Sequence, residues 1–221
     1  MVTFVLIHGA GDGGWSWHLV EAALRDRGHD VVAPDLPADD GSAGLSTYVD
    51  AVVDAIRGRS ELVVAGHSFG GFTAPLVCDR VPARLLVLIA AMIPSPGETP
   101  NDWWTATGYT QEVHTSDDDL TTYYHDVPPA LAAEAMRRER DHPSARSMGE
   151  PWPLAAWPDV PTRVLIGRED RFFPAPFLRR LSHERLGIVP DEIDAVHCVS
   201  LSKPVELAER LISYLATQPP R

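Results

Sequence analysis

Short runs of apolar, often β-branched residues alternate along the chain with segments of helical periodicity, and this alternation constrains the fold more than any other feature. Most of the runs are continuously apolar, as is typical of strands that helices cover on both faces. We expect six strands, at Thr3–His8, Asp30–Ala33, Glu61–Gly66, Leu85–Ala90, Thr162–Gly167 and Glu192–Val196. The alternation predicts an α/β fold with a doubly wound, mainly parallel sheet. A length of 221 residues suits a single domain, residues 1–221.

The alternation is interrupted over about residues 94–160. Pro, Trp, Tyr and Asp accumulate there, in stretches such as "PSPGETPNDWW" and "GEPWPLAAWPDVP". Only "PPALAAEAMRRER" has a strongly helical pattern. We interpret this region as a cap insertion of short helices that lies over the carboxyl edge of the sheet.

Charge and composition exclude several classes of protein. Acidic residues outnumber basic ones 31 to 19, and no Lys/Arg cluster is long enough to follow a phosphate backbone, which disfavours nucleic acid as a partner. No apolar run reaches the roughly 18 residues that span a bilayer, and the first residues lack a basic segment typical of a signal peptide. We therefore expect a cytoplasmic protein without a membrane partner. The preference for Arg over Lys suggests a bacterial source.

Metal binding is not expected from the spacing of the potential ligands. Cys78 and Cys198 lie far apart and match no zinc or redox motif. A group made of His114, Asp117–Asp119 and His125 also fits no zinc spacing. We expect neither a metal nor a cofactor.

A glycine-rich loop follows the first expected strand and admits one rival interpretation. Gly9, Gly11 and Gly14 fit G-x-G-x-x-G, and Asp35 follows about 20 residues later, as in a dinucleotide-binding site. This alternative is a nucleotide-dependent oxidoreductase that uses the Gly9–Gly14 loop. The bulky Trp15 would crowd the helix start that should approach a pyrophosphate.

A second glycine motif surrounds a serine. The stretch "VVAGHSFGGFT" fits G-x-S-x-G, between an apolar run and a helical segment. This pattern is typical of the sharp strand-to-helix turn that exposes a nucleophilic serine. Gly70 and Gly71 would let the helix begin close to the sheet, so Ser68 would lie at a helix N-terminus that favours negative charge.

Two later segments supply the partners that such a serine needs. Glu169 and Asp170 follow the fifth expected strand, and His197 follows the sixth. The order serine, acid, histidine is that of hydrolases, and all three segments end at the carboxyl edge of the sheet. His197 is thus the expected base, with either Glu169 or Asp170 as the acid.

These motifs give the chain a family resemblance. The segments "VLIHGAGDGGWSWHLV", "GHSFGG", "GREDRFFP" and "AVHCVSLSKP" resemble the α/β-hydrolase superfamily, in particular its small branch of plant methyl-ester esterases and hydroxynitrile lyases. The resemblance implies a six-stranded, mainly parallel sheet and no cofactor. It also implies Ser68 as nucleophile, Asp170 as acid through the pattern G-x-x-D, His197 as base, and the backbone N–H groups of Ala10 and Phe69 as the oxyanion hole.

We therefore expect a carboxylesterase-type serine hydrolase that cleaves small esters through an acyl-enzyme. A hydroxynitrile lyase is an alternative, but that branch typically has threonine where this chain has Gly9 and lysine where it has Cys198. A non-catalytic ligand receptor on the same fold is another. Trp15, Trp103 and Trp104 are candidates for the walls of a substrate pocket. The acyl and alcohol groups of the substrate and the oligomeric state stay open.

Overall fold

A six-stranded sheet forms the centre of the computed structural model, which describes residues 2–109 and 118–216. The strand order is β2-β1-β3-β4-β5-β6, and all five neighbouring pairs are parallel. The predicted six-stranded sheet is confirmed, and it is parallel throughout. The strands are β1 (Thr3–Ile7), β2 (Asp30–Val32), β3 (Leu62–His67), β4 (Ala83–Ile89), β5 (Thr162–Gly167) and β6 (Asp191–Ile193).

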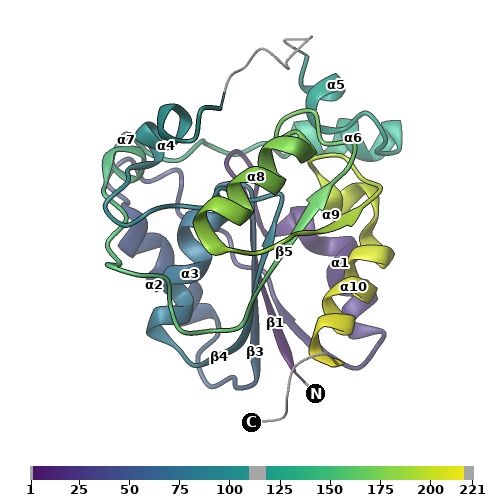
Figure 1. The fold of residues 1–221 in the computed structure, drawn as a ribbon. Coiled ribbons are helices and arrows are strands. Elements are labelled where there is room, and N and C mark those ends of the chain that lie inside the picture. Colours follow the sequence, from purple (N-terminus) through teal and green to yellow (C-terminus); the bar gives the residue numbers. More distant parts are fainter. Residues whose placement is uncertain (1, 110–117, 217–221) are drawn as a thin grey trace.

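Helices cover both faces of this sheet (Figure 1). Along β1, Val5 and Ile7 pack into the core on one face, and Phe4 and Leu6 pack into the core on the other. The first face carries α2 (Leu45–Ala55), α3 (Gly70–Arg80) and α8 (Ala175–Leu186). The second carries η1 (Gly14–Trp17), α1 (His18–Arg25), α9 (Val199–Ser202) and α10 (Pro204–Ala216).

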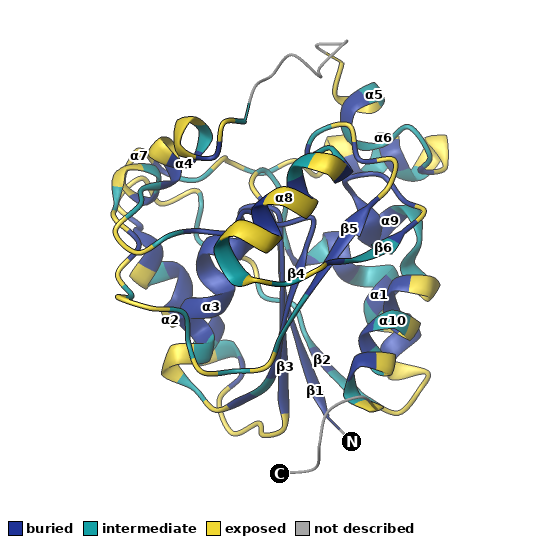
Figure 2. Ribbon diagram, in the orientation of Figure 1, coloured by how far each residue is buried: buried dark blue, intermediate teal, exposed yellow. Residues whose placement is uncertain are grey.

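Helix α2 illustrates how the apolar pattern produces these layers. Leu45, Tyr48, Val49 and Val52 recur at helical spacing, and all four are buried against the sheet (Figure 2). Gly58, just beyond the helix, has a φ of +80°, a conformation that glycine adopts at little cost. The predicted end of this helix is therefore close to the observed one.

Four short helices lie between β4 and β5, near the carboxyl ends of the strands (Figure 1). Three of them begin at a polar residue, Thr99, Asp118 or Ser144, whose side chain accepts a hydrogen bond from a backbone N–H of the first turn. The helices are α4 (Pro100–Ala106), α5 (Asp119–Tyr123), α6 (Pro129–Arg137) and α7 (Ala145–Gly149). Only α6 has a pattern long enough to be evident in the sequence.

Strand β6 is shorter than expected. The pattern predicts Glu192–Val196, whereas the strand ends at Ile193. The chain turns at this point, because the Ala195 N–H donates to the Ile193 carbonyl at 2.9 Å. The turn brings the Ala195 carbonyl against Gly167, where a side chain would overlap it.

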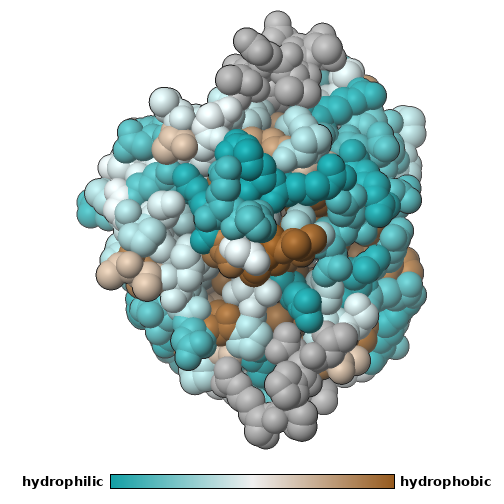
Figure 3. Space-filling model, in the orientation of Figure 1, coloured by the Kyte–Doolittle hydropathy of each residue, from teal (hydrophilic) through white to brown (hydrophobic). Residues whose placement is uncertain are grey.

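The surface on the side shown in Figure 3 is mostly hydrophilic, with a small hydrophobic area near its centre. Val189, between α8 and β6, is 83% exposed. Within the described ranges, no helix combines the length and apolar character needed to cross a membrane.

Candidate active site

Ser68 occupies a sharp turn between β3 and α3. Its φ is +50°, which is unusual for a residue with a side chain. The turn is fixed by the Ser68 carbonyl oxygen, which accepts hydrogen bonds from the N–H groups of Gly71 and Met92, both at 3.0 Å. The Ser68 side chain consequently projects from the carboxyl end of β3, where it lines a cavity.

The glycines after this serine allow a close approach that no larger residue would. A Cβ atom at position 70 would lie 2.8 Å from the Ile7 carbonyl oxygen, and one at position 71 would overlap the Met92 carbonyl oxygen. Helix α3 therefore starts directly against the sheet, and its N-terminus points toward the region around Ser68.

His197 and Asp170 meet at the same edge of the sheet. The His197 Nδ1 lies 2.8 Å from Asp170 Oδ2, and both side chains are buried. Asp170 Oδ1 accepts the backbone N–H groups of Phe172 and Phe173, each at 2.8 Å, which fixes the carboxylate. A carboxylate at Nδ1 favours the proton on that nitrogen and leaves Nε2 able to accept one. Glu169, the other candidate acid, is exposed.

Two further histidines hold the backbone around the site. The His67 Nε2–H donates to the His197 carbonyl at 2.9 Å. His8 Nε2 accepts the Leu36 N–H at 2.9 Å, so its Nδ1–H donates to the Gly9 carbonyl at 2.8 Å. Burial lowers the pKa of His8 and lowers that of His67 to about 3, so both are neutral. Each is a structural support, as their positions beside the motifs suggest.

Ala10 and Phe69, whose N–H groups are the expected oxyanion hole, line the same cavity as Ser68. Neither donates a hydrogen bond to any residue in the described part of the chain. The loop that carries Ala10 is held by the cap, because the Arg140 N–H donates to the Gly11 carbonyl at 2.8 Å. Two N–H groups are thus free to donate to an oxygen bound beside Ser68.

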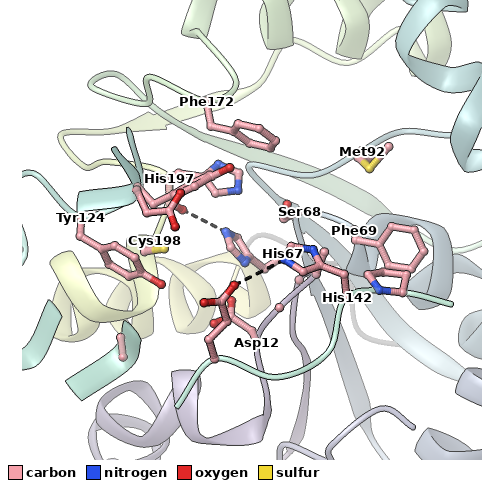
Figure 4. Close-up of a pocket in the computed structure, with 18 of the residues that line it drawn as sticks. Asp12, His67, Ser68, Phe69, Met92, Tyr124, His142, Phe172, His197 and Cys198 are labelled. Atoms are coloured by element: carbon pink, nitrogen blue, oxygen red, sulfur yellow. Dashed lines mark hydrogen bonds and ion pairs between the residues drawn. The ribbon is translucent and has the colours of Figure 1, made fainter. Parts of the chain in front are cut away.

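The cavity has a volume of about 330 Å³, and Figure 4 shows Ser68, His197, Asp12 and Phe172 around it. Its walls come from the loop after β1, the turn after β3, the cap and the segments after β5 and β6. Most of the remaining lining is apolar or aromatic, including Met92, Trp104, Tyr123, Tyr124, Met136 and Met148.

Of the three tryptophans considered as pocket walls, Trp104 lines this cavity and the other two do not. Trp103 is completely buried, and its Nε1–H donates to the Ile93 carbonyl at 3.0 Å. Trp15 stacks on His18 with the Arg138 guanidinium over its ring. Trp15 and Trp103 therefore serve packing, a correction to the sequence-based expectation.

The motifs missed several residues of the cavity wall, of which Asp12 is the most distinctive. It lies in the glycine-rich loop, and burial raises the pKa of its carboxyl group to about 6. Its position in the loop that follows β1, at the carboxyl edge of the sheet, is the sequence signal that could have identified it. Glu139 and His142 also line the cavity, and they come from the cap, where no sequence motif indicates them.

Asp35, the acidic residue of the rival dinucleotide interpretation, is already engaged. Its Oδ1 accepts the Gly14 N–H at 2.7 Å, and its Oδ2 pairs with Arg140 at 2.5 Å. It is therefore not free to bind a ribose hydroxyl.

Within residues 2–109 and 118–216, no three His, Cys, Asp or Glu side chains are grouped to hold a metal ion. His114 and Asp117 lie outside the described residues.

Comparisons with known proteins identify the family and the fold. A family model described as "Alpha/beta hydrolase family" matches residues 4–210. Norfluorocurarine synthase 1 of Strychnos is 26% identical over 94% of this chain and 93% of its own length. The probable esterase PIR7A of rice is 36% identical over 43% of this chain, an alignment that spans only 41% of the rice protein. The crystal structure of a pyrethroid hydrolase from Sphingobium faniae, 22% identical, superposes with a TM-score of 0.79 and covers 98% of both chains.

Proposed function

Because the chain belongs to the alpha/beta hydrolase family, we propose that it is a serine hydrolase that cleaves small carboxylic esters without a cofactor. Relatives named as esterases or hydrolases support ester cleavage as the reaction. The observation that carries the proposal is the buried hydrogen bond between His197 and Asp170, at a cavity that Ser68 also lines.

In the proposed mechanism, Ser68 Oγ attacks the ester carbonyl carbon while His197 Nε2 takes the hydroxyl proton. The negative charge that develops on the carbonyl oxygen is stabilised by the N–H groups of Ala10 and Phe69. His197 then donates its proton to the alcohol oxygen, which leaves, and Ser68 is left acylated. Asp170 holds the imidazole ring in place and stabilises its protonated form.

A water molecule completes the cycle. His197 removes a proton from the water as the water oxygen attacks the acyl carbon, and the proton is then returned to Ser68 as the acid is released. The free Nε2 of His197 is needed in both halves, which is why its other nitrogen must be occupied by Asp170.

The experiment is the hydrolysis of p-nitrophenyl esters of increasing acyl length by the wild-type chain and by Ser68→Ala. We expect the variant to fold normally and to lose roughly 10⁴- to 10⁶-fold in kcat, as serine triads do. The loss of rate beyond a certain acyl length would measure the depth of the cavity. A Ser68→Ala protein that keeps a tenth of the wild-type rate would refute the proposal.

A further inference from the structure

Asp12 brings a carboxylate into the cavity, two residues after the Ala10 N–H group. Among the described residues, no group donates a hydrogen bond to this carboxylate or forms an ion pair with it. His197, Glu139 and His142 line the same cavity. The carboxylate therefore faces the space that a substrate would fill, without a partner of its own.

The other charges around the cavity do not neutralise Asp12. Three of the lining residues are acidic, Asp12, Asp119 and Glu139, and none of the described lining residues is Lys or Arg. Arg138 and Arg140 of the cap have other partners. Arg138 pairs with Glu134 and covers Trp15, and Arg140 pairs with Asp35.

Aromatic rings form part of the wall of the same cavity. Tyr124 interacts electrostatically with Asp12, and the rings of Tyr123 and Phe172 lie beside His197, with centroids 5.7 Å and 4.9 Å from its imidazole. The faces of aromatic rings attract cations, most strongly where water is excluded. An unpaired carboxylate together with aromatic rings, in a cavity whose described lining contains no Lys or Arg, is complementary to a positively charged, partly apolar group.

Building on the proposed esterase function, we propose that the cavity selects esters whose alcohol part carries a positively charged nitrogen, and that Asp12 is the residue that confers this preference. The mechanism is the reason for placing the cation on the alcohol part of the ester and not on the acyl part. The leaving oxygen must meet His197 Nε2 to receive its proton, and Asp12 lines the same cavity as His197 (Figure 4). A cation on the leaving group would be repelled by the transient imidazolium, and the Asp12 carboxylate would offset that repulsion.

The preference should depend on pH, because burial raises the pKa of Asp12 to about 6. The carboxylate is then mostly ionised at pH 8 and mostly neutral at pH 5. The titratable groups that face it come from three segments: His197 and Cys198 after β6, Tyr124 after α5, and Glu139 and His142 after α6. Burial raises the pKa of Cys198 and of Tyr124, so neither changes charge between these two pH values.

The test compares two acetate esters of the same shape by the release of acid in a pH-stat. One is the acetate ester of choline, here called choline acetate, and the other is its uncharged isostere 3,3-dimethylbutyl acetate. At pH 8 we expect the wild-type kcat/KM to be about tenfold higher for the cationic ester, the range of a desolvated cation–π contact. In Asp12→Asn the ratio of the two kcat/KM values, both measured on that variant, should fall to about one. When the pH is lowered through about 6, the wild-type ratio of the two kcat/KM values should fall toward that of the variant. The ratio of the variant should not change with pH.

Asp54→Asn is the matched control, because it removes one exposed carboxylate on α2, paired with Arg57 outside the cavity. It should leave the preference unchanged. An equal loss in both variants would show that the net charge of −12 attracts the cation, and would overturn the assignment to Asp12. Hydrolysis of the neutral ester without any preference for choline acetate would refute the inference and leave the esterase function intact.

Binding provides a measurement that does not depend on catalysis. Choline and 3,3-dimethylbutanol are titrated calorimetrically into Ser68→Ala and into the same variant with Asp12→Asn. We expect choline to bind about tenfold more weakly to the double variant, with the uncharged alcohol unaffected. Equal choline affinity in the two proteins would refute the inference, whether or not the esters were hydrolysed. A failure to hydrolyse either ester would count against the proposed function and not against the inference.

Discussion

At the scale of single residues, the two candidate acids differ in what they touch. Asp170 is buried and bonded to His197, whereas Glu169 is exposed. Asp170→Asn should reduce kcat by about 10⁴-fold, because an amide can hold the imidazole in the wrong tautomer. Glu169→Gln should change kcat by less than a few fold. Both values come from the same p-nitrophenyl ester assay, and an equal loss in the two variants would reassign the acid.

Gly9 and Cys198 are the residues from which we predict ester hydrolysis and not cyanohydrin cleavage. A side chain at position 9 would begin 2.9 Å from the Ser68 Cβ, so glycine keeps the space beside the nucleophile open. Cys198 is a buried thiol whose pKa is raised by burial, and it offers no positive charge to a departing cyanide anion. The Asp12 carboxylate would oppose such an anion.

We therefore expect measurable hydrolysis of short-chain esters and no cyanide release from mandelonitrile above the uncatalysed rate. A colorimetric cyanide assay with wild type and Ser68→Ala checks this. Cyanide release that depends on Ser68, without ester hydrolysis, would contradict it.

The sequence could indicate Ser68, Asp170 and His197 because each follows a predicted strand of a parallel sheet, and parallel strands end at one edge. It could not indicate which tryptophans reach the cavity. Trp103 and Trp104 are adjacent in α4, and only the packing of the helix decides that Trp104 faces the cavity. The place of Asp12 likewise depends on a distant segment, because the Arg140 N–H of the cap donates to the carbonyl of the neighbouring Gly11 at 2.8 Å.

At the scale of secondary-structure elements, the start of α3 is the tightest junction near the site. Gly71→Ala would force its new methyl group against the Met92 carbonyl, so the helix or the loop after β4 must shift. We expect a loss of about 1–3 kcal/mol in the free energy of unfolding, as for other overpacked sites, together with reduced activity.

Gly149→Ala is the control for this prediction, because a Cβ atom there has no neighbour within 4 Å and the backbone conformation is not left-handed. It should be neutral or slightly stabilising. Urea unfolding of both variants gives the comparison. Equal stability of the two variants would show that the contact at position 71 can relax without cost.

The elements differ in how well the sequence predicts them, and the reason is length. Helix α2 spans 11 residues and repeats its apolar stripe, so the pattern identifies it. Helices α5 and α7 span five residues each, less than two turns, and are specified by the N-terminal residues Asp118 and Ser144 together with tertiary contacts. The apolar pattern predicts β6 too long, because it includes Ala195 and Val196. These two residues are buried, but they lie in the turn after the strand.

At the scale of the whole molecule, the buried neutral histidines link stability to pH. The folded pKa of His67 is about 3, against an ordinary value near 6.5, so between these values the unfolded chain binds one more proton. The free energy of unfolding should therefore fall as the pH falls from 6.5 toward 3. His67 alone contributes a slope of at most about 1.4 kcal/mol per pH unit.

His67→Gln removes this contribution and keeps an N–H group that can donate to the His197 carbonyl. Its unfolding free energy, measured in urea between pH 7 and 4.5, should decrease less steeply than that of the wild type. His8, whose pKa is also lowered by burial, should maintain part of the slope in both proteins. Identical slopes would contradict a neutral, buried His67.

The two outermost strands are only three residues long, and this brevity has a consequence for self-association. An exposed strand edge is a template on which a second chain can add its own strand and begin to aggregate. Here β2 starts with Asp30, paired with Arg59, and β6 starts with Asp191 and Glu192, the latter paired with Arg168 and Arg179. At both edges of the sheet, an incoming strand would meet charged side chains. It would also find few backbone groups free to form hydrogen bonds. The central strands, which are strongly apolar, are thus shielded from fibril-like growth by their own neighbours.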